Sequence, residues 1–332
     1  MTEADVVAAV LLTGGTAYAV FGGADFGVGF WDLVAGGAER GKGPRALIDH
    51  AIAPVWEANH VWLIFCLVVL WTGFPDAFAA IMLTLYVPLL AAAVGIVLRG
   101  SGFAFRKVIV RLSGQRLFGA LFALASVLTP FFMGTVVGAV ASSRVPKDGS
   151  GDRFSSWTGL TPIVTGLLFV AACAYLASVF LVWDARRVGK DDLAHYFGRR
   201  ALGAAVVTGG LALAGLIALH RDARFVYDGL VHEGLPFVIV SALAGAAALA
   251  LLVRGAARGA RALAVLAVAA VVWGGGVAQY PYLLPTSLKV SQAAAPDDTL
   301  TALLVVAGVA AAIVAPALAL LYSLQQRSLL DE

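Results

Sequence analysis

Charged residues are scarce in this chain of 332 residues, where lysine, arginine, aspartate and glutamate together make up 13%. A soluble domain usually contains about 25%. Hydrophobic residues make up 61% of the chain, which is more than one globular core can bury, so the composition indicates a protein solvated by lipid. The net charge of +3 is too small and too scattered to indicate nucleic-acid binding.

Residues that bind metals are also few. The two cysteines, Cys66 and Cys173, lie in apolar runs without a Cys-x-x-Cys motif, so neither a zinc site nor a thiol redox pair is supported. Of the five histidines only His60 falls well inside a predicted helix, and a haem site with one histidine from each of two helices is therefore not predicted. We expect this chain to bind no metal or cofactor directly and to hold no catalytic residue.

Long apolar runs predict an all-α, polytopic membrane protein with about nine spans, because a bilayer core takes about 20 apolar helical residues. The start of the chain is acidic rather than basic, so we expect no signal peptide and a retained first helix. Residues 1–332 are expected to form a single transmembrane domain without a separate soluble domain. The predicted spans are Ala4–Leu33, Pro54–Thr72, Asp76–Leu98, Leu117–Val140, Gly159–Trp183, Ala201–Leu219, Leu235–Val253, Ala262–Ala278 and Thr301–Tyr322.

Basic residues predict the orientation of these spans. If the N-terminus lies outside, the inner loops and helix ends carry 17 of the 23 lysines and arginines. Short cytoplasmic loops are enriched in lysine and arginine. We therefore expect an outside N-terminus, a cytoplasmic C-terminus and an odd number of spans.

Two carboxylates, Asp25 and Glu57, stand out because they fall inside predicted spans. A charged group there costs several kcal/mol, roughly, unless it is paired, solvated or protonated, and such residues often mark ion or proton pathways. The predicted orientation puts both toward the cytoplasmic side, where neighbouring helices could hold them in one polar pocket. The alternative is structural: Glu57 caps its helix and Asp25 pairs with a loop arginine.

Other polar residues surround these two in the sequence. Asn59 and His60 follow Glu57, and His60 is spaced to share its helix face. His60 could relay protons or be a hydrogen-bonded core histidine. Arg99, predicted at the inner end of the third span, and Trp56 are candidates for an ion-pairing or structural role; for Arg99 the alternatives are snorkelling or a pair with Asp25 or Glu57.

These segments resemble subunit II of cytochrome bd-type quinol oxidases. The family has a glycine-rich first helix with Phe-Asp-Phe-Gly-Val-Gly or a close variant, and an Ile-Ala/Gly-Pro-x-Trp-Asp-Gly-Asn-x-Val-Trp-Leu motif. The corresponding segments here are ADFGVG (24–29), IAPVWEANHVWL (52–63), FP (74–75) and RGSGFAFR (99–106), with a weaker match at Tyr280-Pro281 and Pro285. Glutamate and alanine replace the usual Asp-Gly at 57–58, and Gly22 lies near the place of a second acid often found in the family, which indicates a divergent member.

The resemblance implies a bacterial cytoplasmic-membrane complex that oxidises quinol and reduces oxygen to water. Haem b and haem d, or b-type haems only, would be held by the partner subunit I, with small single-helix accessory subunits as further candidate partners. This chain would then be the subunit that ligates no haem. Glu57, which corresponds to the family's helix 2 acid, and Asp25, which corresponds to its helix 1 acid, would contribute to the proton path from the cytoplasm. From the polar cluster around Glu57, we expect Asn59 and His60 to belong to the same path.

Two other functions remain open from the sequence. The first is a proton-coupled transporter, although matching broken helices in two internal repeats, typical of such proteins, are not evident. The second is a purely structural assembly subunit in which both acids are inert.

Overall fold

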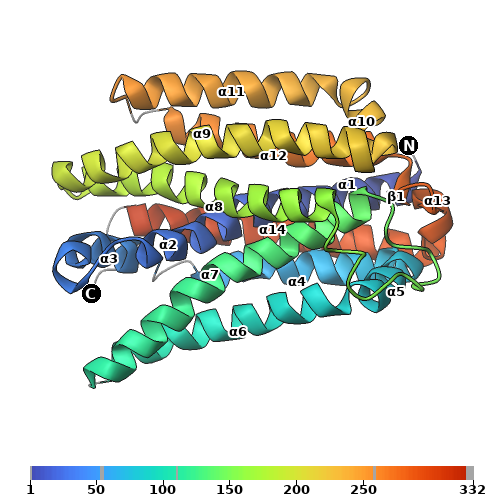
Figure 1. Ribbon diagram of the computed structural model, residues 1–332. Coiled ribbons are helices and arrows are strands. Elements are labelled where there is room, and N and C mark those ends of the chain that lie inside the picture. Colours follow the sequence, from blue (N-terminus) through green and yellow to red (C-terminus); the bar gives the residue numbers. More distant parts are fainter. Residues whose placement is uncertain (1, 53–55, 110, 257–258, 327–332) are drawn as a thin grey trace.

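The chain folds into long helices that run side by side, and the computed structural model describes residues 2–52, 56–109, 111–256 and 259–326 (Figure 1). Within these ranges eight helical segments are long and apolar enough to cross a membrane, and counting the bent pair α4–α5 gives nine. The prediction of an all-α polytopic membrane protein with about nine spans is therefore confirmed.

The spanning segments lie close to their predicted positions, with one exception given below. They are α1 (Glu3–Ala17), η1 (Tyr18–Gly22) and α2 (Gly23–Leu33) as the first span, α4 (Trp56–Gly73) with α5 (Pro75–Thr84), α6 (Tyr86–Val108), α7 (Leu112–Ala141), α8 (Leu160–Arg187), α9 (Asp191–Asp222), α11 (Leu235–Val253), α12 (Ala260–Gln279) and α14 (Asp297–Gln326). Shorter elements join them, namely α3 (Ala38–Ile52), α10 (Arg224–Val231), β1 (Tyr282–Leu284), β2 (Leu288–Lys289) and α13 (Val290–Ala293).

The predicted third span, Asp76–Leu98, is wrong as one continuous helix. Pro75 starts the short helix α5, which is bent by 117° from α4, and the helix breaks again at Leu85. Proline is favoured at the first helical position, where its missing N–H is not needed. The long span therefore begins at Tyr86 and continues to Val108, which places Arg99 inside a helix rather than at its end.

The two ends of the bundle differ in structure. One end carries α3, a helix in a segment that was predicted as a loop, and the other carries α5, α10, α13 and the antiparallel pair β1–β2 (Figure 1). The loop at residues 142–159 is ordered by local bonds, since the amides of Ser155 and Phe154 donate to the Asp152 carboxylate and lower its pKa. The loops that were predicted to lie inside share one end of the bundle, and those predicted to lie outside share the other. Which end faces the cytoplasm stays a prediction.

Helix α2 packs against both α7 and α8 because two of its motif residues are glycines. A Cβ at Gly27 would overlap the main-chain carbonyl of Cys173, and one at Gly29 would overlap the side chain of Ser126. Small residues let neighbouring membrane helices approach closely. The glycines of the ADFGVG segment therefore bring Asp25 into the interior of the bundle.

Candidate functional site

The Asp25 carboxylate lies in the first turn of α2 and is buried, with 6% of the residue exposed. The Asn59 side-chain amide, from α4, donates a hydrogen bond to Asp25 Oδ2 at 2.6 Å. Asn59 is itself buried. Two of the predicted site residues therefore meet across two helices, 34 positions apart in the sequence.

Arg99 is the third member of this site, at 1% exposure. Its Nη2 donates to the main-chain carbonyl of Asp25 at 2.8 Å, and its Nε donates to the Ser126 hydroxyl at 3.1 Å. The guanidinium also lies over the rings of Phe26 and Phe122, at 5.0 and 5.3 Å from their centroids. Arg99 is thus a buried neighbour of Asp25 and hydrogen-bonds to the Asp25 backbone. Because its side chain is buried, the alternative that Arg99 snorkels to the surface is excluded.

His60 borders the same interior region from α4. Its ring centroid lies 6.1 Å from that of Tyr18 and 6.0 Å from that of Phe26. Phe26 is fully buried next to Asp25. His60, which was predicted to share a helix face with Glu57, therefore contacts two residues that border the Asp25 site.

Glu57 lies on a different side of α4. It is exposed in this chain, as are Val61, Ile64, Val68 and Trp71, which follow at helical spacing and form what we call the α4 stripe. Asn59 is two positions after Glu57 and so points about 200° away around the helix axis. The expectation of one buried pocket that holds both carboxylates is therefore wrong for this chain by itself.

The side chain of Trp56 lies outside what the structure describes. It is the one predicted site residue for which no placement is given.

A second polar cluster, which the sequence analysis missed, joins the ends of α2, α3 and α6. Asp32 is 5% exposed and accepts hydrogen bonds from Arg45 Nε at 2.8 Å and from Arg106 Nη1 at 2.6 Å. Arg106 also pairs with Asp49 of α3. We call these four residues the inner ion cluster; they tie α3 to the bundle.

The inner ion cluster approaches the Asp25 site through an aromatic ring. Phe122 lies under the guanidinium of Arg106 at 4.6 Å and under that of Arg99 at 5.3 Å. Such stacking is favourable because the ring face carries negative potential. One sequence pattern could have indicated that Asp32 is buried like Asp25. The two acids are seven residues apart and thus share a helix face.

The chemistry of the Asp25 site is that of a carboxyl group held between opposing influences. Burial disfavours its charged form, whereas the nearby Arg99 and the Asn59 hydrogen bond favour it. A carboxyl group in such a balance can exchange a proton when its surroundings change.

The described residues hold no cluster of the kind that binds a metal ion through several protein ligands. Among them no group of three or more His, Cys, Asp or Glu side chains could hold a metal. The His60 ring, the one histidine well inside a span, lies against Tyr18 and Phe26.

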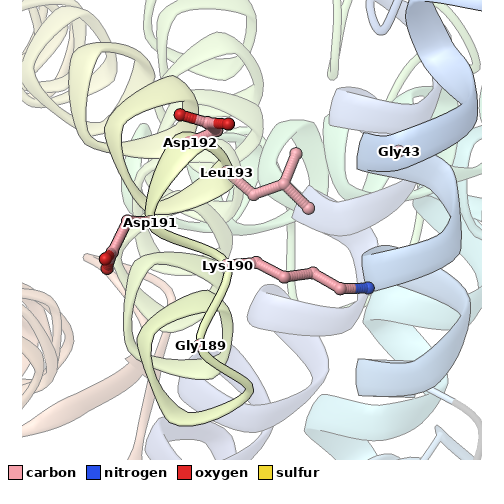
Figure 2. Close-up of a pocket in the computed structure, with 6 residues that line it drawn as sticks. All are labelled: Gly43, Gly189, Lys190, Asp191, Asp192 and Leu193. Atoms are coloured by element: carbon pink, nitrogen blue, oxygen red, sulfur yellow. The ribbon is translucent and has the colours of Figure 1, made fainter.

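A surface hollow lies apart from the Asp25 site, at the turn between α8 and α9. It has a volume of about 580 Å³ and lies between this turn and α3. The Lys190 side chain extends toward the helix that holds Gly43 (Figure 2). Its lining mixes one basic with two acidic side chains, and none of the predicted site residues belongs to it. The lining residues are Gly43, Gly189, Lys190, Asp191, Asp192 and Leu193.

A helical membrane bundle with a buried, hydrogen-bonded carboxyl group beside an arginine is typical of membrane proteins that handle protons or ions. Residues 4–325 match the family described as cytochrome bd terminal oxidase subunit II. The chain belongs to this family.

Individual relatives agree with the family match. The chain is 25% identical over 239 residues, 71% of its length and 68% of the relative, to cytochrome bd ubiquinol oxidase subunit 2 of Bacillus subtilis (strain 168). It is 30% identical over 129 residues, 39% of its length and 32% of the relative, to cytochrome bd-I ubiquinol oxidase subunit 2 of Escherichia coli (strain K12). A chain in the structure of the bd oxidase from Geobacillus thermodenitrificans has the same fold, with a TM-score of 0.81, 23% identity and 98% coverage of both chains.

Proposed function

We propose that this chain is the subunit of a bacterial quinol oxidase that ligates no haem and that takes up protons from the cytoplasm for the reduction of oxygen to water. Two observations support the proposal. The family and the relatives named above are subunits of cytochrome bd oxidases. The buried contact of Asp25 with Asn59, beside Arg99, supplies a carboxyl group suited to proton exchange.

The contact between Asp25 and Asn59 carries the proposal. Polar side chains are costly in a membrane interior and are retained there mainly for function. The Asn59 amide N–H holds the carboxyl group in place and favours its charged form, and after rotation the amide oxygen can accept a hydrogen bond from the protonated form. The contact therefore positions Asp25 and leaves it free to change protonation.

The α4 stripe is the face that we assign to the haem-bearing partner, subunit I. Its exposed residues are apolar except for Glu57 at one end. A carboxylate on a face that met only lipid would be unfavourable, whereas a protein partner can solvate or pair it. The charge of Glu57 thus favours a protein, rather than lipid alone, as the neighbour of this stripe.

The proposed route uses the two sides of α4. Glu57 receives protons on the side of α4 that faces the partner, near the predicted cytoplasmic end. The protons then pass Asn59 and His60, on the other side of α4, to reach Asp25. The haems of the partner would supply the electron transfer from quinol to oxygen. Small accessory subunits and the cytoplasmic membrane location belong to the same proposal.

Asp25→Asn in the purified oxidase, reconstituted with its partner, tests this function. We expect quinol oxidation to fall by about 100-fold, at the lower end of the usual contribution of a positioned acid or base. Proton uptake after an oxygen pulse, followed with a pH indicator, should slow in parallel. Glu57→Gln should lower both rates in the same direction.

The control is Asp76→Asn, which neutralises an exposed carboxylate in the first turn of α5 at the opposite end of the bundle. It should leave both rates unchanged. The haem absorption spectrum should be normal in all three variants. Normal proton uptake in Asp25→Asn would show instead that this chain is a structural assembly subunit.

A further inference from the structure

Tyr18 occupies a special position in the first span. It begins the π-helical turn η1, which interrupts the α-helix one turn before Asp25. Such turns are rare and occur frequently at functional sites. The Tyr18 ring lies against Phe26 and His60, with centroids 6.3 and 6.1 Å away.

Gly22 makes room for this ring. A Cβ at residue 22 would lie 2.8 Å from Tyr18 Cε2 and 2.9 Å from Tyr18 Cδ2. A larger side chain at this position would push the ring away from the interior. The glycine and the π-helical turn together therefore hold Tyr18 in the bundle beside His60.

The Tyr18 hydroxyl is buried, with 7% of the residue exposed, and no hydrogen-bond partner is found for it among the described residues. Buried polar groups almost always have a partner, either in the protein or in ordered water. The titratable and charged groups that interact electrostatically with Tyr18 are Asp25 of α2, Arg99 of α6, Cys173 of α8 and Cys66 of α4. His60 of α4 faces its ring.

We propose that the Tyr18 hydroxyl is a further proton-relaying group of the Asp25 site and hydrogen-bonds through water to the polar groups around it. This inference rests on the proposed proton-uptake function. A hydroxyl can donate and accept at the same time. It takes a proton from a protonated water chain on one side, which leaves neutral water there, while its own O–H proton passes to the acceptor on the other side, so tyrosine stays neutral and no oxidant is needed.

Tyr175 provides a matched comparison within the same chain. It lies on α8, is 4% exposed and also has a buried hydroxyl without a hydrogen-bond partner among the described residues. Among the described residues no charged group acts on the Tyr175 hydroxyl, whereas Asp25 and Arg99 act on that of Tyr18. Tyr175→Phe therefore removes the same atom without touching the proposed relay.

The experiment compares Tyr18→Phe with Tyr175→Phe in the reconstituted oxidase, with its partner and haems present. For Tyr18→Phe we expect kcat to fall by about five- to tenfold, as for the loss of one hydrogen bond in the rate-limiting proton transfer. The KM for quinol should stay unchanged, and the solvent deuterium isotope effect on kcat should rise. Tyr175→Phe should change none of these.

A second variant tests the hydroxyl while keeping the packing. Fluorotyrosine at position 18 makes the hydroxyl more acidic and should shift the pH profile of kcat, whereas the same replacement at position 175 should not. Unchanged kcat, isotope effect and pH profile for both position-18 variants would overturn the relay role. If the position-18 variants are unchanged while proton uptake by Asp25→Asn is slow, the relay role of Tyr18 fails alone. If proton uptake by Asp25→Asn is also normal, the proposed function fails with it.

Discussion

Two acids on one face of the first span have different surroundings, and these surroundings assign them different roles. Asp32 accepts hydrogen bonds from two guanidinium groups, those of Arg45 and Arg106, and forms an ion pair with each. Asp25 accepts from the neutral amide of Asn59, while the described hydrogen bonds of Arg99 go to main-chain and hydroxyl oxygens. Asp32 is therefore suited to joining α2, α3 and α6, and Asp25 to the proton exchange proposed above.

The inner ion cluster predicts a difference between its two acids. Asp32→Asn should lower the free energy of unfolding by about 1–3 kcal/mol, because it removes the buried charged acceptor of Arg45 and leaves Arg106 with Asp49 alone. Asp49→Asn removes the more exposed acid and should cost less, about 1 kcal/mol or below. Thermal denaturation of the purified oxidase measures both, and equal losses would contradict the assigned difference in burial.

At the scale of elements, the packing of α2 depends on the absence of side chains at specific positions. Gly27 and Gly29 face the backbone of α8 and the Ser126 side chain of α7. The positions of Asp25 and its neighbours follow from this close approach. A helix with larger residues here would stand further from α8 and would separate the groups that meet at the site.

Gly27→Ala should destabilise the protein by about 1–3 kcal/mol, because the added methyl group overlaps a carbonyl in the backbone of α8 that cannot move aside alone. Gly15→Ala is the matched control, since nothing lies within 4 Å of a Cβ at that position. Alanine there should stabilise the helix by about 0.5–1 kcal/mol. Thermal denaturation midpoints that move in the same direction for both variants would disprove this account of α2.

At the scale of the whole molecule, exposed apolar side chains cover most outward helix faces, as expected of a protein in lipid. The α4 stripe differs because it ends in Glu57. Helix α9 also has exposed apolar residues, for example Leu213 and Ile217, but none of these residues adjoins the Asp25 site. The α4 stripe, which we assign to the partner, can therefore be compared with the exposed face of α9 within one chain.

Ile64→Trp places a larger side chain in the middle of the α4 stripe and should reduce the amount of haem-bearing partner that co-purifies, because an interface packed to protein density does not accept the extra volume. Leu213→Trp on α9 is the control and should co-purify with a normal amount of partner. The ratio of haem absorbance to this chain measures both. Equal haem content in the two variants would remove α4 as the partner face.

Much of the site could be predicted from residue types and from the family resemblance. Asp25, Asn59, His60 and Arg99 do lie around one interior region. Tyr18, Ser126 and the inner ion cluster were missed, because each owes its role to a partner on another helix. Glu57 was placed on the right helix but on the wrong side for a pocket shared with Asp25.

The sequence by itself determined the class of this protein and the approximate position of its spans, because the transfer of apolar residues into lipid is a local property that adds along the chain. It did not determine the break at Leu85, the bend of α5 or the helix α3. The tertiary structure decided which face of each helix is buried and which polar groups meet. Those choices depend on close contacts between segments far apart in sequence, such as Gly27 with Cys173, and hydrophobic periodicity carries no record of them.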